Sequence, residues 1–313
     1  MAGRTSDATA KRRQFRSLLA RPEIAVMPGG FSPLLARMVE RLGFDAFFIA
    51  GSQVSAFLYG LPDNGIIGLG EMATHARHVA AACDIPVLID GDTGYGNAVN
   101  VHFAVEEFVR SGAAGVQFED QEAPKKSATQ AGRRCISTEE AVGKIRAAVA
   151  ARNALDPEFV ICARCDVLGA EGGSFAEALE RSIAYVRDGG ADFVWLNSVE
   201  SRDDIARACA DIPAPVMTIW GGEGPPPTIP ELQALGQRIA FYPVMASVFA
   251  AQSAFALLSD FKERGTAMLE EWNQRRDPRA NAGALVGLER IRAIEEASLP
   301  AALRRDYDTT WGH

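Results

Sequence analysis

Short apolar segments alternate with longer helix-like segments along most of the chain. The apolar segments are rich in Val, Ile and Phe and are bounded by Gly, Pro or Asp, which is typical of buried strands. They cover residues 24–27, 46–50, 86–89, 115–118, 159–163, 193–196, 215–219 and 239–242. The segments between them predict helices over residues 33–43, 68–82, 98–111, 138–153, 174–188, 201–210, 229–236 and 246–264, and an amphipathic helix precedes them at residues 7–20.

This alternation predicts an α/β fold with eight strands and eight helices, a (β/α)₈ TIM barrel. We expect a single barrel domain over residues 1–313, with an extra N-terminal helix and a C-terminal helical extension from about residue 265. A doubly wound open sheet is the alternative, but the first strand is not followed by a glycine-rich dinucleotide turn. The apolar face of the extension needs a second surface, and a neighbouring subunit of a homo-oligomer would provide one.

The composition of the chain limits the kinds of partner that the protein is expected to bind. The chain has 313 residues, is 48% hydrophobic and carries a net charge of −8. The acidic balance argues against nucleic acid as a partner. No apolar run reaches the length of a membrane span, so we expect no membrane association. The five cysteines lie mostly within apolar runs, which indicates reduced thiols and a cytoplasmic protein.

Acidic residues follow two neighbouring strands. Asp90 and Asp92 end the strand at 86–89 and precede a glycine-rich turn, and Glu119 ends the next strand. Carboxylates in such positions are costly without a partner, and a hard cation such as Mg²⁺, or Mn²⁺, is the simplest one. The three can share a cation directly or through water. A strand-end turn with solvated aspartates is the alternative interpretation.

Other strand ends bring polar groups that suit an anion. Arg164 and the backbone at Gly51 and Ser52 can hold a carboxylate, and Asn197 ends the following strand. A cation beside an anion clamp suits stabilisation of an enolate next to a carboxylate. We therefore expect a small anionic carboxylate as substrate. A structural ion pair between Arg164 and Asp166 is the simpler alternative for that strand end.

Histidine chemistry is not expected. The chain holds His75, His78, His102 and the terminal His313, and the first three lie on predicted helices. None ends a strand, which argues against a Ser–His triad, a His-ligated zinc site and a histidine base.

A set of motifs carries a family resemblance over residues 14–264. The motifs are MPGG (27–30), GSQVSAFLYGLPDNG (51–65), DGDTGYGN (90–97), FEDQEAPKK (118–126), GRRCIS (132–137) and ARCD (163–166). In this order they resemble the isocitrate lyase/phosphoenolpyruvate mutase superfamily, and the methylisocitrate lyases in particular. The resemblance implies a Mg²⁺-dependent barrel that forms a dimer or tetramer by exchanging a helix between subunits.

The resemblance also implies roles for single residues. Asp90, Asp92 and Glu119 would hold Mg²⁺. Gly51, Ser52 and Arg164 would bind the carboxylate end of the substrate. Asp63 would lie near the metal and its waters, and Lys125 would belong to a mobile gating loop.

The chain departs from the family at the residues that decide the reaction. Lyases carry KKCGH or KRCGH in the gating loop, with Cys as proton donor, whereas this chain reads KKSAT from Lys125. Ser127 is a far weaker acid than a thiol, although a hydroxyl there resembles phosphonopyruvate hydrolase. Phe48 and Asn197 replace a common Tyr and Glu. Cys135 is a candidate substitute thiol, or simply a small buried side chain.

These features predict an enzyme that forms or stabilises the enolate of a small 2-oxo or 2-hydroxy carboxylate. Carbon–carbon cleavage is the leading hypothesis, of the dicarboxylate lyase or oxaloacetate decarboxylase type. The alternative is carbon–phosphorus chemistry on phosphonopyruvate-like substrates. A non-catalytic binding barrel is a third hypothesis, against which the intact carboxylate set argues. Among the catalytic candidates are Ser127, Lys125, Asp63 and Arg164.

Overall fold

The predicted strands form one parallel sheet that curls into a nearly closed barrel. The computed structural model describes residues 7–127 and 130–305. Within it the strand order is β7-β6-β5-β4-β3-β2-β1-β8. The strands are β1 (Ala25–Gly30), β2 (Phe47–Ile49), β3 (Val87–Asp90), β4 (Gly115–Glu119), β5 (Val160–Cys165), β6 (Phe193–Val199), β7 (Val216–Trp220) and β8 (Ile239–Tyr242). The (β/α)₈ prediction is therefore confirmed.

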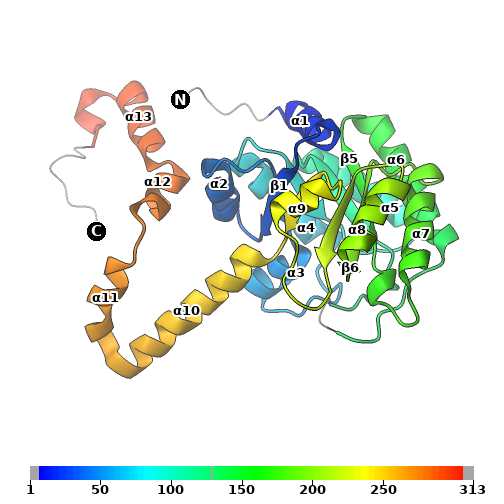
Figure 1. Ribbon diagram of the computed structural model, residues 1–313. Coiled ribbons are helices and arrows are strands. Elements are labelled where there is room, and N and C mark those ends of the chain that lie inside the picture. The colour runs from blue at the N-terminus through cyan, green and yellow to red at the C-terminus, as the bar shows by residue number, and fades with distance from the viewer. Residues whose placement is uncertain (1–6, 128–129, 306–313) are drawn as a thin grey trace. The chain divides into compact units, whose positions relative to one another are not determined.

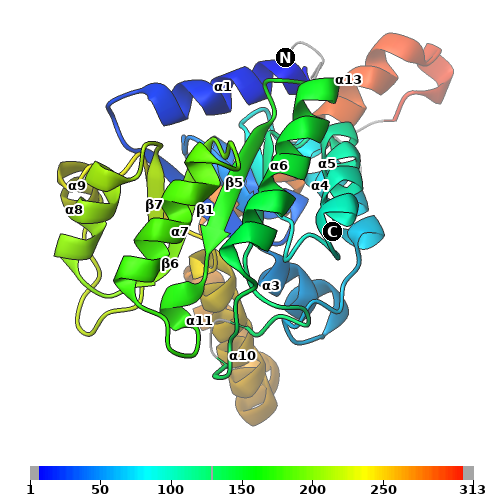
Figure 2. The same cartoon turned by 90° about the vertical axis from the view of Figure 1, so that its right-hand side faces the viewer.

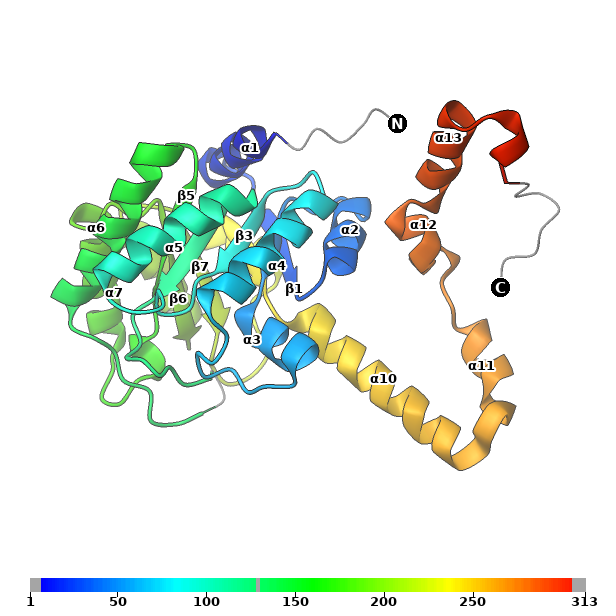
Figure 3. The same ribbon diagram turned by 180° about the vertical axis from the view of Figure 1, so that it is seen from behind.

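Helices cover the outside of the barrel, as Figures 1 and 3 show from opposite sides. They are α1 (Ala8–Ala20), α2 (Pro33–Arg41), α3 (Gly51–Val54), the π-helix η1 (Ser55–Tyr59), α4 (Leu69–Ala82), α5 (Ala98–Ser111), α6 (Thr138–Leu155), η2 (Val167–Gly169), α7 (Phe175–Arg187), α8 (Arg202–Asp211) and α9 (Ile229–Ala234). Helix α10 (Met245–Arg264) follows β8. Several begin where the sequence offers a side-chain cap: Ser137 accepts a hydrogen bond from the Glu140 N–H, and Ser174 from that of Glu177.

Each strand alternates its side chains between the barrel interior and the helix layer. The interior cluster includes Phe48, Cys162, Trp195, Met217 and Phe241. A second cluster joins the outer faces of the strands to the surrounding helices. This alternation places Asp90 of β3, Glu119 of β4 and Arg164 of β5 in the same mouth of the barrel.

Helix α1 closes the opposite end of the barrel. Figure 2 shows it lying across the end where β5 begins. Phe15 is fully buried and meets Phe193 edge-on, with ring centroids 6.0 Å apart. Lys11 Nζ donates to the carbonyls of Ala80 (2.8 Å) and Cys83 (2.6 Å). With the N-terminal end sealed, the C-terminal ends of the strands are left as the open mouth.

The chain divides into two compact units, one up to Gln252 and one from Ser253. Helix α10 contributes to both. The described remainder of the second unit contains η3 (Gly265–Met268), α11 (Leu269–Gln274), η4 (Pro278–Ala280), α12 (Ala282–Val286), α13 (Leu288–Ser298) and η5 (Ala301–Leu303). No helix among the described residues is long and apolar enough to span a membrane.

Candidate active site

The turn after β3 is held in an unusual backbone conformation. Asp92 and Tyr95 have positive φ values of 49° and 60°, which non-glycine residues seldom adopt. At Gly94, with φ 88°, an added Cβ would lie 2.3 Å from Val101. Lys144 of α6 donates to the Thr93 carbonyl at 3.1 Å and ties the turn to the helix layer. Local strain of this kind persists where the surrounding structure fixes a functional geometry.

Asp90 is anchored from three sides. Its Oδ2 accepts the Gly51 N–H at 3.0 Å, and its Oδ1 accepts the Asp92 N–H at 3.1 Å. Gln117 Nε2 also donates to Oδ1. Gly51 approaches so closely that an added Cβ would lie 2.9 Å from Asp90 Oδ2. The Gly51 N–H therefore serves Asp90 in this structure, and Ser52 lies beside it, half-buried.

Lys125 lies between two of the carboxylates. Its Nζ is 2.9 Å from Asp63 Oδ1 and also contacts Asp92 Oδ1. Its side chain is only 3% exposed. Burial by itself would lower the pKa of Lys125, but Glu119, Asp92 and their acidic neighbours raise it well above its usual range. The lysine is therefore a fixed positive charge that holds the start of the gating loop against the acidic cluster.

Asp92 and Glu119 are under-satisfied in their anionic forms. Burial raises the pKa of Asp92 to about 6, more than Lys125 lowers it. Burial likewise raises the pKa of Glu119 to about 8, in spite of Arg164 and Lys125. Glu119 Oε1 is buried without a hydrogen-bond partner among the described residues, whereas Glu119 Oε2 and Asp92 Oδ1 face the ion-paired nitrogens of Arg164 and Lys125. A cation bound between them would stabilise the charged forms of both carboxylates and lower their pKa values.

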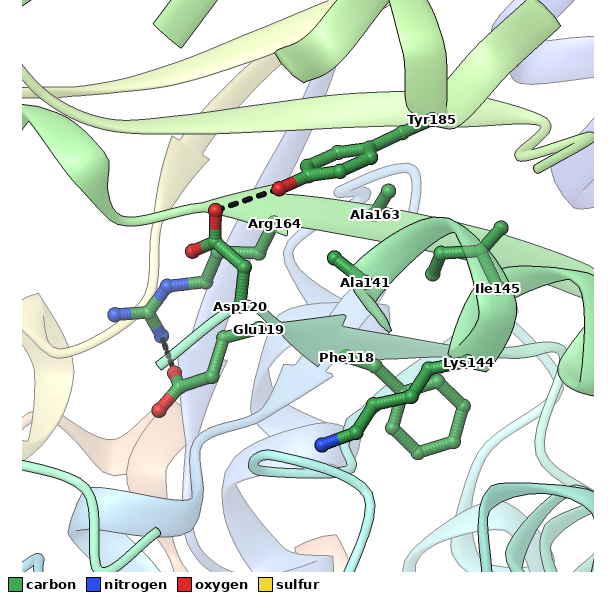
Figure 4. Close-up of a pocket in the computed structure, with 9 residues that line it drawn as sticks. All are labelled: Phe118, Glu119, Asp120, Ala141, Lys144, Ile145, Ala163, Arg164 and Tyr185. Carbon is green, nitrogen blue, oxygen red and sulfur yellow. Dashed lines mark hydrogen bonds and ion pairs between the residues drawn. The ribbon is translucent and has the colours of Figure 1, made fainter. Parts of the chain in front are cut away.

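Arg164 joins β5 to the neighbouring strands. Its Nη1 lies 2.9 Å from Glu119 Oε2, and its Nη2 donates to Asp166 Oδ1 at 3.0 Å. Figure 4 shows the guanidinium between these strand ends. It also lies over the Trp195 ring, 4.1 Å from the centroid, where a cation is stabilised by the ring face.

Asp166 accepts hydrogen bonds from side chains on three segments of the chain. Arg133 Nη1 lies 3.1 Å from Asp166 Oδ1, and Asn197 Nδ2 donates to the same oxygen at 2.5 Å. Burial would raise the pKa of Asp166, but Arg164 and Arg133 outweigh it and hold the pKa below its usual range. Asn197 is thus engaged with Asp166 in this structure. The ion pair of Arg164 and Asp166 and the anion-clamp role of Arg164 are compatible, because the guanidinium has further N–H groups.

The two ends of the predicted gating loop, which lies within residues 121–135 after β4, are held together by backbone contacts. Gln121 and Cys135 form an antiparallel bridge, and the Glu122 N–H donates to the Arg134 carbonyl at 2.9 Å. Ser127 is half-buried, and its N–H donates to Gln130 Oε1 at 3.1 Å. Residues 128 and 129, the end of the KKSAT motif, lie outside the described residues.

Asn64 docks the gating loop onto the loop after β2. Its Nδ2 donates to the Lys125 carbonyl at 3.0 Å and to Gln130 Oε1 at 2.9 Å. Lys125 reinforces this contact through its ion pair with Asp63. Asp63, Lys125 and the Ser127 backbone are therefore brought together.

The sequence did not single out the supporting residues. Gln117 is fully buried and donates to Asp90; its inward register, two residues before Glu119, is a signal that could have found it. Tyr185 of α7 donates to Asp120 Oδ2 at 2.7 Å, a bond drawn in Figure 4. Nothing in the local sequence distinguishes Tyr185 from an ordinary core tyrosine. His75 and His78 lie on α4 and His102 on α5, as expected.

The geometry defines an α/β-barrel enzyme site with clustered acids beside an arginine at the strand ends. The phosphoenolpyruvate phosphomutase family model matches residues 15–258. The chain belongs to this family, and thus to the isocitrate lyase/phosphoenolpyruvate mutase superfamily of enzymes.

Three relatives illustrate the range of the superfamily. The 2,3-dimethylmalate lyase of Eubacterium barkeri is 36% identical over 90% of this chain and 96% of its own. An oxaloacetate acetylhydrolase bound to 3,3-difluorooxalacetate superposes with a TM-score of 0.82 at 29% identity, over 92% of this chain and 97% of that one. A phosphonopyruvate hydrolase bound to oxalate and Mg²⁺ gives 0.79 at 29% identity, over 93% and 99%.

Proposed function

We propose that this enzyme forms or stabilises the enolate of a small 2-oxo or 2-hydroxy carboxylate and cleaves a carbon–carbon bond. The observation that carries the proposal is the surplus of buried and half-buried acidic side chains near Arg164 at the barrel mouth. The acids are Asp63, Asp90, Asp92, Glu119 and Asp166, and the bases facing them are Lys125, Arg133 and Arg164. A divalent cation would balance this surplus.

The carboxylate oxygens of the site are suitable ligands for Mg²⁺, or for Mn²⁺ in its place. Among residues 7–127 and 130–305, no three acidic, His or Cys side chains form a ready-made metal cage. Mg²⁺ does not require one, since it keeps several waters and takes one or two carboxylates together with its substrate. Asp90, Asp92 and Glu119 would hold it, partly through water, and Asp63 would hydrogen-bond those waters. A metal there would polarise the 2-oxo group.

The chain's own residues would bind and orient the substrate. Arg164 would hold the carboxylate, with Ser52 and Asn197 at the neighbouring strand ends. Lys125 would keep the base of the gating loop closed over the acids. Ser127 would donate a hydrogen bond or position water, because its hydroxyl is too weak an acid to release its own proton quickly.

Carbon–phosphorus chemistry on phosphonopyruvate-like substrates is the second candidate. The hydroxyl of Ser127 in the gating loop favours it, and so does the likeness to a phosphonopyruvate hydrolase. Assays with oxaloacetate, 2-methylisocitrate, 2,3-dimethylmalate and phosphonopyruvate would separate it from carbon–carbon cleavage.

Metal removal tests the proposal. After exhaustive chelation we expect turnover to vanish and to return with Mg²⁺ or Mn²⁺. Calorimetry should detect Mg²⁺ binding to the wild type and much weaker binding to Asp90→Asn, since that variant loses a charge. Glu122→Gln, a loop carboxylate that is exposed, is the matched control and should bind Mg²⁺ as the wild type does. Full activity in the chelated enzyme would remove the central claim.

The setting of the enzyme is part of the proposal. We propose a cytoplasmic protein, because all five cysteines are free thiols. We also propose a homo-oligomer, a dimer or tetramer, in which the helices from α10 onward contact a second subunit.

A further inference from the structure

Two arginines from different segments of the chain meet at one buried carboxylate. Asp166, which follows β5, is fully buried. Arg133 belongs to the segment between β4 and α6, and its Nη1 lies 3.1 Å from Asp166 Oδ1. Arg164 of β5 donates from Nη2 to the same oxygen at 3.0 Å, and its Nε lies 2.9 Å from Asp166 Oδ2. The two guanidinium groups therefore share a single acid.

The surrounding backbone makes room for Arg133 at this position. Its side chain is only 4% exposed. A Cβ added at Gly169, the last residue of η2, would lie 2.5 Å from Arg133 Nη1 and 2.8 Å from its Cζ. The Arg133 carbonyl accepts the Glu171 N–H at 3.0 Å, which holds the backbone as well. A charged side chain is buried at this cost when an ion pair compensates it, and Asp166 provides that pair.

The charges around Arg164 show what the second arginine contributes. Arg164 also lies 2.9 Å from Glu119 Oε2, so its single positive charge faces two acids, and Figure 4 shows this second contact. When Glu119 and Asp166 are both ionised, Arg164 alone would leave a negative charge in excess, which repels a substrate carboxylate. Arg133 brings these four groups to zero net charge. The remaining N–H groups of Arg164 can then attract a further anion.

The other side chains that donate to Asp166 in the described part of the chain are uncharged. Asn197 Nδ2 donates to Oδ1, and Gln121 Nε2 donates to Oδ2 at 3.3 Å. Arg134, the next residue along the chain, is directed elsewhere: its side chain is 67% exposed and forms an ion pair with an exposed glutamate. The second positive charge on Asp166 therefore comes from Arg133, and Arg134 is a neighbouring arginine without that contact.

We propose that Arg133 is a positioning residue for substrate binding. By sharing Asp166 with Arg164, it keeps the Arg164 guanidinium available to the carboxylate of the substrate. It acts through Asp166 and needs no contact with the substrate itself. This inference rests on the proposed function, because it takes Arg164 as the site of that carboxylate.

Oxalate is a suitable probe, since it is a small dianion and is the ligand in the structure of the related phosphonopyruvate hydrolase. Calorimetry on the full-length protein would measure oxalate binding at one fixed Mg²⁺ concentration and, in separate titrations, Mg²⁺ binding alone. Arg133→Met should weaken oxalate binding by about tenfold or more, because the lost charge acts at short range in a buried site. Mg²⁺ binding without oxalate should stay equal or become tighter, because a positive charge has been removed.

Three further variants separate charge from structure. Arg133→Lys keeps the charge and should recover most of the oxalate affinity. Arg134→Met removes a charge from the exposed neighbouring position and should bind oxalate within about twofold of wild type. Gly169→Ala changes no charge, but its Cβ would displace the Arg133 guanidinium, so oxalate binding should weaken in this variant too. Gly169→Ala decides the inference if Arg133→Met does not fold.

Unchanged oxalate binding in Arg133→Met would overturn the inference and leave the proposed function in place. Unchanged binding in Gly169→Ala would do the same where Arg133→Met does not fold. An equal loss of Mg²⁺ and oxalate binding would also overturn it, since that result indicates a general loss of structure at the mouth. Wild-type protein that binds no oxalate with Mg²⁺ would remove the carboxylate site of the proposed function, and the inference with it.

Discussion

By the family resemblance, Ser127 takes the place in the predicted gating loop of the cysteine that donates a proton in the lyases. A serine hydroxyl can orient the substrate or a water but not supply its proton rapidly. We expect Ser127→Ala to lower kcat/KM by about ten- to a hundredfold, or roughly 1–3 kcal/mol of transition-state stabilisation. Steady-state kinetics on the best substrate from the panel would measure this loss.

Cys135 provides the matched control in the same loop. Burial raises the pKa of the Cys135 thiol far above its usual range, and Asp120 and Asp166 add to the effect. Its Sγ lies 3.6 Å from Asp120 Oδ1, a contact that a serine hydroxyl can replace. Cys135→Ser should therefore stay within a few-fold of wild type. Equal activity of Ser127→Ala and wild type would mean that the loop does not deliver Ser127 to the substrate.

Tyr185 connects helix α7 to the end of β5. Its hydroxyl donates to Asp120 Oδ2, while Asp120 Oδ1 accepts the Asp166 N–H at 2.8 Å. Tyr185→Phe should lower the free energy of unfolding by about 1–3 kcal/mol, because a buried carboxylate loses a donor. Urea denaturation would measure the loss. Tyr59→Phe, at a side chain 47% exposed, should change stability little, and an equal loss in both variants would contradict this role.

Gln237 lies just before β8 and connects it to β7, the neighbour with which β8 forms no strand pair. Its Nε2 donates to Thr218 Oγ1 at 2.7 Å, and its Oε1 accepts the Thr218 N–H at 3.3 Å. Gln237→Leu would leave a buried N–H unpaired, so we expect about 1–3 kcal/mol less stability. Denaturant unfolding of this variant, beside Gln14→Leu on the exposed face of α1, would test it. Unchanged stability would show that this side-chain contact does not stabilise the junction of β7 and β8.

The secondary-structure elements show how much of the fold can be predicted from the pattern of apolar residues. Every strand was predicted to within a few residues, because each buries an apolar run. The predictions ended too early at β1, β5 and β6. At β5 and β6 backbone pairing continues past polar side chains: Glu119 pairs with Arg164, and Val199 with Trp220. No helix was predicted for residues 51–59, but they form α3 and η1. Such short helical turns carry no periodicity to detect.

The candidate site shows a different limit. The sequence alone predicts that Asp90, Glu119 and Arg164 lie close together, because the C-terminal ends of the parallel strands of a barrel meet at one mouth. Which of them pair with one another depends on side-chain geometry. The ion pair of Lys125 with Asp63 joins two loops, and the hydrogen bond of Asn197 to Asp166 joins β6 to the residue that follows β5. Neither contact follows from spacing along the chain.

At the scale of the whole molecule, the helices from α10 onward leave much apolar surface uncovered. Phe255 is 76% exposed and Leu258 is 64% exposed on α10, and Leu288 is 61% exposed on α13. In α10 only Ser247 is buried. A helix with so many apolar side chains is stable in water when another surface covers it.

We therefore expect light scattering at micromolar concentration to show a dimer or tetramer. Phe255→Asp combined with Leu258→Asp should shift the protein toward monomer, because each aspartate would place a charge in the covered surface. The matched control is Lys262→Ala on the same helix, which should leave the assembly unchanged. Circular dichroism would confirm that the barrel stays folded in the double variant, since its own core lies in the other unit. A folded, active wild-type monomer would contradict the assembly.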